Sequence, residues 1–147
     1  MSFEAQSKMS GKEFFLKLNK DTMGIVAEFY APEAVLIDPV GQESGSHKIR
    51  AYYEHQYKNL KEIHWDFSKQ IIQGRTEILE WQMTIRHPAL NGGDRFTVPG
   101  SSIIEFDVSG RAVKHHDYFD MGAFVYERIP GFRFIINFIK RRLQAGS

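Results

Sequence analysis

TEILEWQMTIRHPALNGGDRFTVPGSSIIEFD, residues 76–107, contains two segments in which apolar and polar side chains alternate, and these segments decide the fold. A period of two is typical of a β-strand with one buried face. The segments 76–87 and 94–107 are separated by Asn91-Gly92-Gly93, residues that adopt the positive φ angles of tight hairpin connections. The stretch therefore predicts two paired antiparallel strands.

The same alternation continues on both sides of this pair. One further segment covers residues 63–73 and ends at Gly74-Arg75, and another covers residues 112–120 after Ser109-Gly110. Short connections that contain glycine join neighbouring antiparallel strands. The second half of the chain is therefore predicted to be a meander of four strands.

Three helical patterns precede the meander. Ser10 and Glu13 have the spacing of a capping box and predict a helix over about 11–20. A second short helix is expected to end at Ala31-Pro32, because the residue before a proline avoids the α region. A third helix, with Ser46 as its N-cap and a tyrosine-rich face, is predicted to reach Leu60. A short strand, 35–37, lies between the last two helices, so the fold class is α+β with helices on one face of the sheet.

Composition limits the classes of protein that need to be considered. The 147 residues are enough for one domain, and 42% hydrophobic with 14% aromatic residues can form a packed core. The net charge of +1 gives no indication of a nucleic-acid partner. No cysteine is present, which indicates a reducing compartment, and no apolar run is long enough to span a bilayer. We therefore expect a single domain, 1–147, in the cytoplasm.

Two motifs resemble known families. Residues 30–53, YAPEAVLIDPVGQESGSHKIRAYY, resemble ketosteroid isomerases, and residues 115–120, HHDYFD, resemble the last strand of limonene-epoxide hydrolases and SnoaL-like polyketide cyclases. All these families belong to the nuclear transport factor two-like superfamily. The resemblance implies a curved antiparallel sheet that helices wrap into a cone around an apolar pocket. It covers about residues 10–122 in element order, and the tail lies outside it.

Asp38 has two interpretations. Asp38-Pro39-Val40-Gly41 has the composition of a type I turn, and spacing alone favours that role. The resemblance to ketosteroid isomerases implies instead a base that moves a proton between carbon atoms. The two oxyanion donors of those enzymes align with Phe14 and Ser102, which are poor replacements for a tyrosine and a protonated aspartate. Steroid isomerisation itself is therefore not expected.

The last predicted strand places His115 and Asp117 on one face, between Val113 and Phe119. They point into the pocket if that face is the buried one, whereas a partly solvated strand would leave them without a catalytic role. The resemblance to epoxide hydrolases implies that Asp117 is an acid–base residue. The Arg-x-Asp pair of those hydrolases is missing from the most similar strand, 79–83, so epoxide hydrolysis lacks part of its machinery.

We therefore predict Asp38, Asp117 and His115 as catalytic residues. The residues that we expect to contact the substrate are Phe14, Leu18, Tyr53, Trp81, Met83, Ser102, Ile104 and Phe119. Trp81 and Met83 also fit a plain core role. A pocket-facing hydroxyl among Tyr52, Tyr53 and Tyr57 could replace the donor missing at Phe14. The histidines show no ligand spacing and no phosphate-binding loop is present, so no metal or cofactor is expected.

The tail differs in character from the rest of the chain. Residues 128–147 hold five basic side chains and no acidic one, so the tail has a charge of +5 and residues 1–127 a charge of −4. A helix from Pro130 to Leu143 is predicted, with a wide apolar stripe and a basic C-terminal end. The simpler interpretation is a helix that packs across the cone mouth or against a dimer partner. The alternative is docking to a membrane surface or another partner.

These features together predict a small-molecule protein. The expected function is binding or acid–base transformation of a small hydrophobic carbonyl compound, of isomerase, cyclase or hydrolase type, by a protein that forms homodimers. The alternative is a non-catalytic module that binds a ligand or docks through its C-terminal helix.

Overall fold

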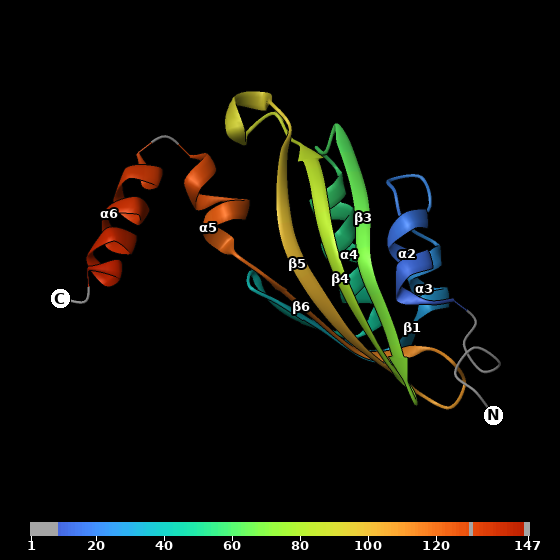
Figure 1. Cartoon of the computed structure of the whole chain (residues 1–147). Helices are drawn as coiled ribbons and strands as arrows, with labels where there is room; N and C mark the ends of the chain where they lie inside the picture. The colour runs from blue at the N-terminus through green and yellow to red at the C-terminus, as the bar shows by residue number, and fades with distance from the viewer. Residues whose placement is uncertain (1–8, 130, 146–147) are drawn as a thin grey trace.

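The computed structural model describes residues 9–129 and 131–145, and its centre is a strongly curved sheet that does not close into a barrel (Figure 1). The strands are β1 (Tyr30–Asp38), β2 (Gly41–Ser44), β3 (Glu62–Gln73), β4 (Thr76–Arg86), β5 (Phe96–Phe106) and β6 (Ala112–Phe119). The helices are α2 (Gly11–Lys17), α3 (Ile25–Phe29), α4 (Ser46–Tyr57), α5 (Met121–Phe124) and α6 (Phe132–Gln144), and two 3₁₀ turns are η1 (Asn91–Gly93) and η2 (Tyr126–Arg128). Helices α2, α3 and α4 pack against one face of the sheet, which confirms the α+β class.

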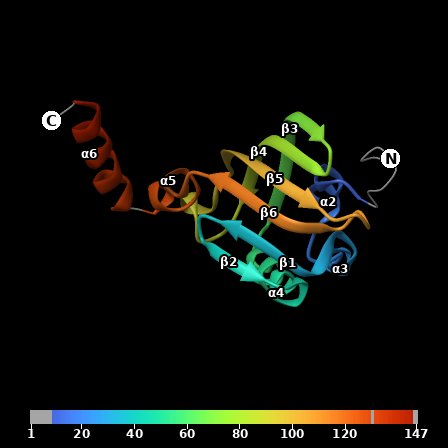
Figure 2. The same cartoon turned by 90° about the horizontal axis from the view of Figure 1, so that it is seen from below.

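The meander is confirmed. Strands β3, β4, β5 and β6 pair consecutively and antiparallel, and the sheet order is β2-β1-β6-β5-β4-β3. The strand ends lie within one or two residues of the predicted ones, because alternation in these strands marks the buried face directly: along β4, each second side chain from Glu77 to Ile85 is buried. Figure 2 shows β6 between β1 and β5.

The second helix was predicted to end at Ala31-Pro32. This boundary is wrong, because α3 already ends at Phe29. Strand β1 begins at Tyr30, two residues before the proline, and runs parallel to β6. Its pairing with β6 is irregular between Tyr30 and Val35, and Pro32, which has no N–H to donate, lies within that irregular stretch. A proline is therefore accommodated inside a strand that the sequence indicated only at residues 35–37.

Strand β2 lies where the sequence indicated no strand. It forms a short hairpin with β1 in which Asp38 pairs with Gly41. Its four residues, Gly41–Ser44, are polar or small and mostly exposed, so they carry no hydrophobic alternation. The hairpin holds Asp38 at the end of β1.

Helix α2 begins as predicted, since the Ser10 side chain accepts a hydrogen bond from the Glu13 amide at 3.1 Å. It is shorter than predicted, because Leu18 is already extended. Helix α4 begins at Ser46, but its N-cap is Gly45, whose φ of 98° favours glycine over the predicted serine cap.

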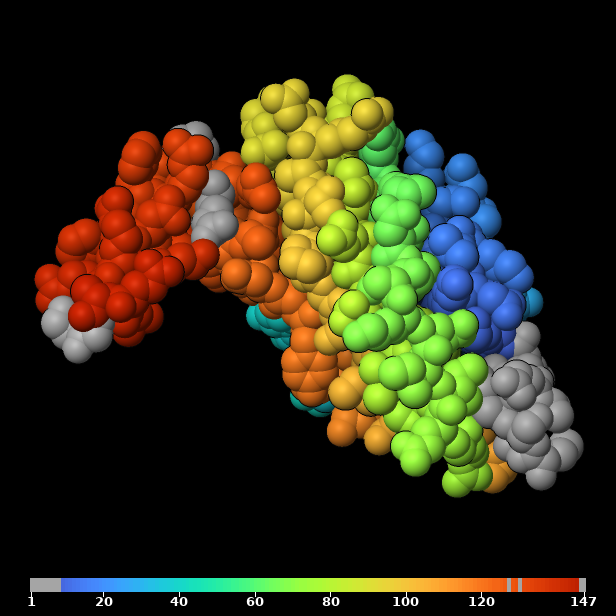
Figure 3. Space-filling model, in the orientation of Figure 1, coloured from blue at the N-terminus to red at the C-terminus, as the bar shows by residue number. Residues whose placement is uncertain are grey.

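The C-terminal segment projects away from the sheet and the helices that cover it. After β6, α5 and η2 were not predicted, and they lead to α6 (Figures 1 and 3). The predicted first residue of this helix, Pro130, lies outside the described residues. Every described side chain of α6 except Ile136 is exposed.

Within the described parts of the chain, we find no helix with the length and apolarity that crossing a bilayer demands.

Gly100 makes room for the Trp81 indole. The two residues are paired across β4 and β5, and a Cβ atom on Gly100 would lie 2.3 Å from the Trp81 ring. We expect Gly100→Ala to lower the free energy of unfolding by about 1–3 kcal/mol, the typical cost of overpacking. Urea denaturation measures this effect. Gly24→Ala is the matched control because no atom lies within 4 Å of its added methyl group. Equal stability of the two variants would show that Trp81 moves away without cost.

Candidate active site

A cavity of about 260 Å³ lies between the sheet and α4. Aromatic side chains form much of its wall: Phe15, Tyr57, Trp65, Trp81, Phe119 and Phe124. The carboxylates that line it are Asp38 and Asp117. A shallow outer groove also touches both of these residues, so the two carboxylates lie between the cavity and solvent.

Asp38 has the turn role that its spacing indicated, and its second oxygen contacts a tyrosine of the cavity wall. Its Oδ1 atom accepts hydrogen bonds from the amides of Val40 at 2.8 Å and Gly41 at 3.1 Å, which is the turn role. Its Oδ2 atom accepts a hydrogen bond from the hydroxyl of Tyr52, a residue of α4 that also lines the cavity. The turn therefore holds one oxygen and presents the other toward the cavity wall.

Asp117 lies beside Asp38. In the parallel pairing of β1 with β6, Ile37 is opposite His116, so the next residues along the two strands are Asp38 and Asp117. Neighbouring strands are about 4.8 Å apart. Two carboxylates on adjacent strands at the wall of one cavity are a common arrangement for acid–base chemistry.

A chain of hydrogen bonds connects Asp117 to the interior. Asp117 Oδ1 contacts His115 Nε2 at 2.6 Å, and His115, which is fully buried, contacts the Tyr30 hydroxyl through Nδ1 at 2.6 Å. The Tyr30 hydroxyl lies 2.9 Å from that of Tyr53, which lines the cavity. An ionised Asp117 orients the whole chain: His115 Nε2 donates to it, Nδ1 accepts from Tyr30, and Tyr30 accepts from Tyr53.

A second branch of hydrogen bonds reaches the same oxygen of Asp117 from β5. The Ser102 hydroxyl donates to Asp117 Oδ1 at 2.5 Å, and the Trp81 indole N–H donates to the Ser102 oxygen at 2.9 Å. Ser102 is fully buried and Trp81 nearly so. His115 and Ser102 therefore hold the Asp117 carboxylate in one orientation, and Asp117 lines the cavity.

The tyrosines around this site are held neutral. Burial raises the pKa of Tyr30, Tyr53 and Tyr57 well above its usual value, and burial together with the hydrogen bond to Asp38 raises the pKa of Tyr52. Neutral tyrosine hydroxyls both donate and accept hydrogen bonds. The site therefore keeps its donors at any ordinary pH.

These shifts predict a loss of stability in alkali. A pKa that is higher in the folded state stabilises the fold below the unfolded value of about 10, and this contribution disappears as the pH rises further. Tyr30, Tyr53 and Tyr57 together should lower the free energy of unfolding by up to about 4 kcal/mol per pH unit above pH 10. Guanidinium denaturation at several pH values measures the slope. Tyr57→Phe should reduce the slope by up to about 1.4 kcal/mol per pH unit, and an unchanged slope would contradict the assignment.

The predicted site residues fall into three groups. Asp38, Asp117, Tyr53, Trp81, Met83 and Phe119 line the cavity. His115 and Ser102 lie behind the wall, where each contacts Asp117. The structure places Phe14, Leu18 and Ile104 in the hydrophobic core.

Helix geometry explains why Phe15 takes the place predicted for Phe14. Successive residues of an α-helix point about 100° apart, so only one of two neighbouring aromatics can face the cavity. Phe14 stacks on Phe29 with ring centroids 4.3 Å apart, whereas Phe15 lines the cavity and stacks on Trp65 at 4.8 Å. A contact of Phe14 with a ligand is therefore not supported by its position.

Sequence reasoning missed the contacts of Tyr30 and Tyr52. Tyr52 was named only as one of three tyrosines that could supply a hydroxyl, and its position three residues after Ile49 on α4 was the available signal. Tyr30 was placed in a helix, so nothing in the sequence indicated its contact with His115. That contact depends on the parallel pairing of β1 with β6.

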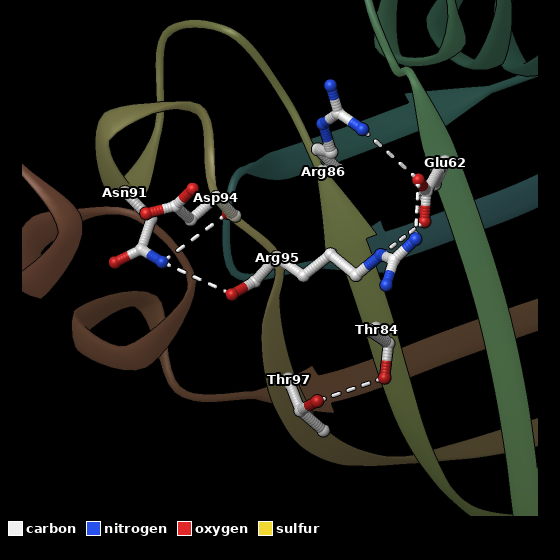
Figure 4. A network of polar contacts seen from close by, with 7 residues as sticks. All are labelled: Glu62, Thr84, Arg86, Asn91, Asp94, Arg95 and Thr97. Atoms are coloured by element: carbon white, nitrogen blue, oxygen red, sulfur yellow. Dashed lines mark hydrogen bonds and ion pairs between the residues drawn. The ribbon is translucent and has the colours of Figure 1, made fainter.

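A second polar network, drawn in Figure 4, consists of solvent-exposed side chains that are not among those lining the cavity. Glu62 accepts hydrogen bonds from Arg95 at 2.6 Å and Arg86 at 3.3 Å, and the Arg95 guanidinium lowers the pKa of the Glu62 carboxyl. Such exposed ion pairs contribute little to stability.

Among the residues described, none of the His, Asp and Glu side chains gather in threes as a metal site would require.

Solved structures share this fold. A SnoaL-like polyketide cyclase from Shewanella denitrificans is 16% identical, with 72% of this chain and 84% of that chain covered and a TM-score of 0.64. A protein of unknown function from Burkholderia pseudomallei, described as similar to nuclear transport factor two, is 20% identical over 82% and 92% of the two chains, with a TM-score of 0.65. An epoxide hydrolase from M. tuberculosis, of the limonene-epoxide hydrolase type, is 15% identical over 76% and 80%, with a TM-score of 0.63.

The sequence itself is matched by one family model. No curated protein sequence matches the chain significantly. The model of the SnoaL-like domain matches residues 12–115, which is more than half of the chain and includes β1 to β5 and the first half of β6, up to His115. With the cone of helices and sheet around an aromatic cavity, this match confirms the resemblance: the chain belongs to the SnoaL-like domain family, within the nuclear transport factor two-like fold.

Proposed function

We propose that the cavity binds a small hydrophobic molecule that carries a carbonyl group and moves a proton on it by acid–base chemistry. The observation that carries this proposal is the position of Asp38 and Asp117, side by side on β1 and β6 at the wall of one aromatic cavity. An apolar cavity with few polar groups at one place is the usual form of a small-molecule site.

Asp38 is the base of the proposed reaction. Its Oδ2 atom takes a proton from the carbon next to the carbonyl, and negative charge then develops on the carbonyl oxygen. Tyr52, which donates to the same Oδ2 atom, is the nearest neutral donor and can turn its hydroxyl toward that oxygen as Asp38 becomes protonated. Tyr52 thus takes the role of the donor that is absent at Phe14.

Asp117 and His115 are the proton partners. The proton that Asp38 takes from carbon can pass to Asp117, its neighbour on β6, which returns it to another atom of the substrate, so both carboxylates regain their starting charge. His115 is fully buried and connects Asp117 with Tyr30 and Tyr53 by hydrogen bonds, and its Nε2–H stabilises Asp117 once the proton has left. Both ends of this chain line the cavity. The arrangement supports return of a proton to a different atom of the substrate, as an isomerase or cyclase requires.

Relatives named as cyclases and as an epoxide hydrolase are compatible with this class of chemistry. Epoxide hydrolysis is the less favoured reaction here, because β4 supplies Trp81, Met83 and Ile85 to the cavity wall and contains no Arg-x-Asp pair. We therefore favour proton transfer of the isomerase or cyclase type over epoxide hydrolysis as the reaction in this cavity.

Ligand binding can be tested at the rim of the cavity. Val40 lines the cavity and is 51% exposed, so Val40→Trp should narrow the opening without disturbing the core. Binding of a hydrophobic cyclic ketone, measured by native mass spectrometry, should fall at least about tenfold, which corresponds to roughly 1.4 kcal/mol. Val108→Trp, at an exposed turn on β5–β6, is the matched control. Equal binding by both variants would place the ligand elsewhere.

A further inference from the structure

The described part of the tail, helix α6, is exposed on nearly all sides. Phe132, Ile135, Phe138, Ile139 and Leu143 are each at least half exposed. Among the contacts of α6, the substantial ones are with η2, and α6 projects from the body in both views of the chain (Figures 1 and 2). Large apolar surfaces of this kind mark an interaction site.

The apolar side chains form one stripe. With about 100° between successive residues, Phe132, Ile135, Ile136, Ile139 and Leu143 fall within an arc of roughly 100°. Lys140 and Arg133 follow on one side of this stripe, and Arg142 lies on the other. Basic residues therefore border the apolar surface along both edges.

Two of these cations lie over aromatic rings outside the stripe. The guanidinium carbon of Arg133 is 5.3 Å from the centre of the Phe134 ring, and that of Arg142 is 6.0 Å from the centre of Phe138. No acidic residue occurs from Arg128 to Ser147. An apolar stripe edged by cations on long side chains fits the boundary between acyl chains and negatively charged headgroups.

We propose that α6 docks the protein to the surface of an anionic lipid bilayer, with its axis parallel to the membrane. Thirteen helical residues extend only about 20 Å, too short for a bilayer core of about 30 Å, so the helix lies on the membrane rather than across it. This inference does not depend on the chemistry proposed for the cavity.

The charge pattern favours lipid over a second copy of the chain. A stable protein interface buries about 800 Å² on each partner and involves about 20–30 residues a side, more than α6 alone offers. Two α6 helices packed together would also bring together basic edges of the same sign, whereas anionic headgroups neutralise both edges.

Vesicle sedimentation of the full chain tests the proposal. We expect binding to vesicles of phosphatidylcholine mixed with phosphatidylglycerol and weak binding to phosphatidylcholine alone. Ile139→Glu should reduce binding roughly tenfold to a hundredfold, because it places a carboxylate in the stripe. Leu16→Glu is the matched control, since Leu16 is 57% exposed on α2 and carries the same change in charge.

The contribution of the basic residues to vesicle binding is tested separately. The double variant Arg133→Gln, Arg142→Gln removes one cation from each edge of the stripe and should weaken binding to the anionic vesicles roughly 20- to 30-fold and reduce its sensitivity to salt. Circular dichroism verifies that each variant is folded. Absence of wild-type binding, equal binding to both vesicle types, or equal loss with Leu16→Glu would overturn the proposal. A dimer that Ile139→Glu converts to a monomer, without vesicle binding by the wild type, would instead identify a second copy as the occupant.

Discussion

Asparagine in place of Asp38 is expected to slow proton transfer in the cavity by roughly 10²–10⁴-fold, the usual contribution of a general base. The amide has nearly the same shape and keeps an oxygen that can accept from the amides of Val40 and Gly41, so the turn should persist. It has no basic oxygen to accept a proton from carbon. The measurement is the exchange of α-hydrogens of a cyclic ketone for deuterium, followed by NMR in heavy water.

The control for this variant is Asp66→Asn. Asp66 has a 68% exposed side chain on β3 and is not among the residues that line the cavity. Its variant should exchange the ketone hydrogens at the wild-type rate. If Asp38→Asn lowered the rate no more than Asp66→Asn, Asp38 would have only its role in the turn. A similar rate loss in Asp117→Asn, with ketone binding unchanged, would support the paired role of the two carboxylates.

The largest expected effect on stability comes from Glu77. This side chain is fully buried on β4 and accepts hydrogen bonds from the amides of Gly11 at 2.6 Å and Lys12 at 3.3 Å and from Gln70 at 3.0 Å. Those amides belong to the first turn of α2, where a carboxylate is favourable. Glu77→Ala leaves these donors unpaired and opens a cavity, so we expect the free energy of unfolding to fall by about 3–5 kcal/mol.

Chemical denaturation measures this loss, and Glu80→Ala on the same strand is its control. Glu80 points to the exposed face, with a 54% exposed side chain that contacts Ser68, so its removal should cost about 1 kcal/mol or less. Glu77→Gln keeps the shape and one acceptor, and should lie between the two. A Glu77→Ala variant as stable as Glu80→Ala would mean that water or another side chain takes over the contact with α2.

The meander was predictable because its signal is local. In β4, burial follows the alternation of side chains residue by residue, so the sequence pattern and the structure agree. Strand β1 was found only in part, since its first half contains a proline and pairs irregularly with β6. Strand β2 and helix α5 are too short to have a period, and helix α5 begins at the cap formed by Asp120, which accepts from the Gly122 amide at 2.7 Å.

The site was predictable to the extent that strand alternation determines it. His115 and Asp117 share the inner face of β6 as expected, and Phe119 follows them in the cavity wall. The position of Asp38 beside Asp117 depends on the register of two strands far apart in sequence, which no local pattern contains. The same limit explains why Tyr30 was missed.

The central claim is that Asp38 and Asp117 act on a carbonyl compound bound in the cavity. The most direct test is a crystal structure of the protein soaked with a hydrophobic cyclic ketone. The carbonyl oxygen is expected within about 2.6–3.2 Å of the Tyr52 hydroxyl, with the neighbouring carbon beside Asp38 Oδ2. A ketone bound outside the cavity, or inside it with the carbonyl turned toward Leu90 and away from both carboxylates, would contradict the claim.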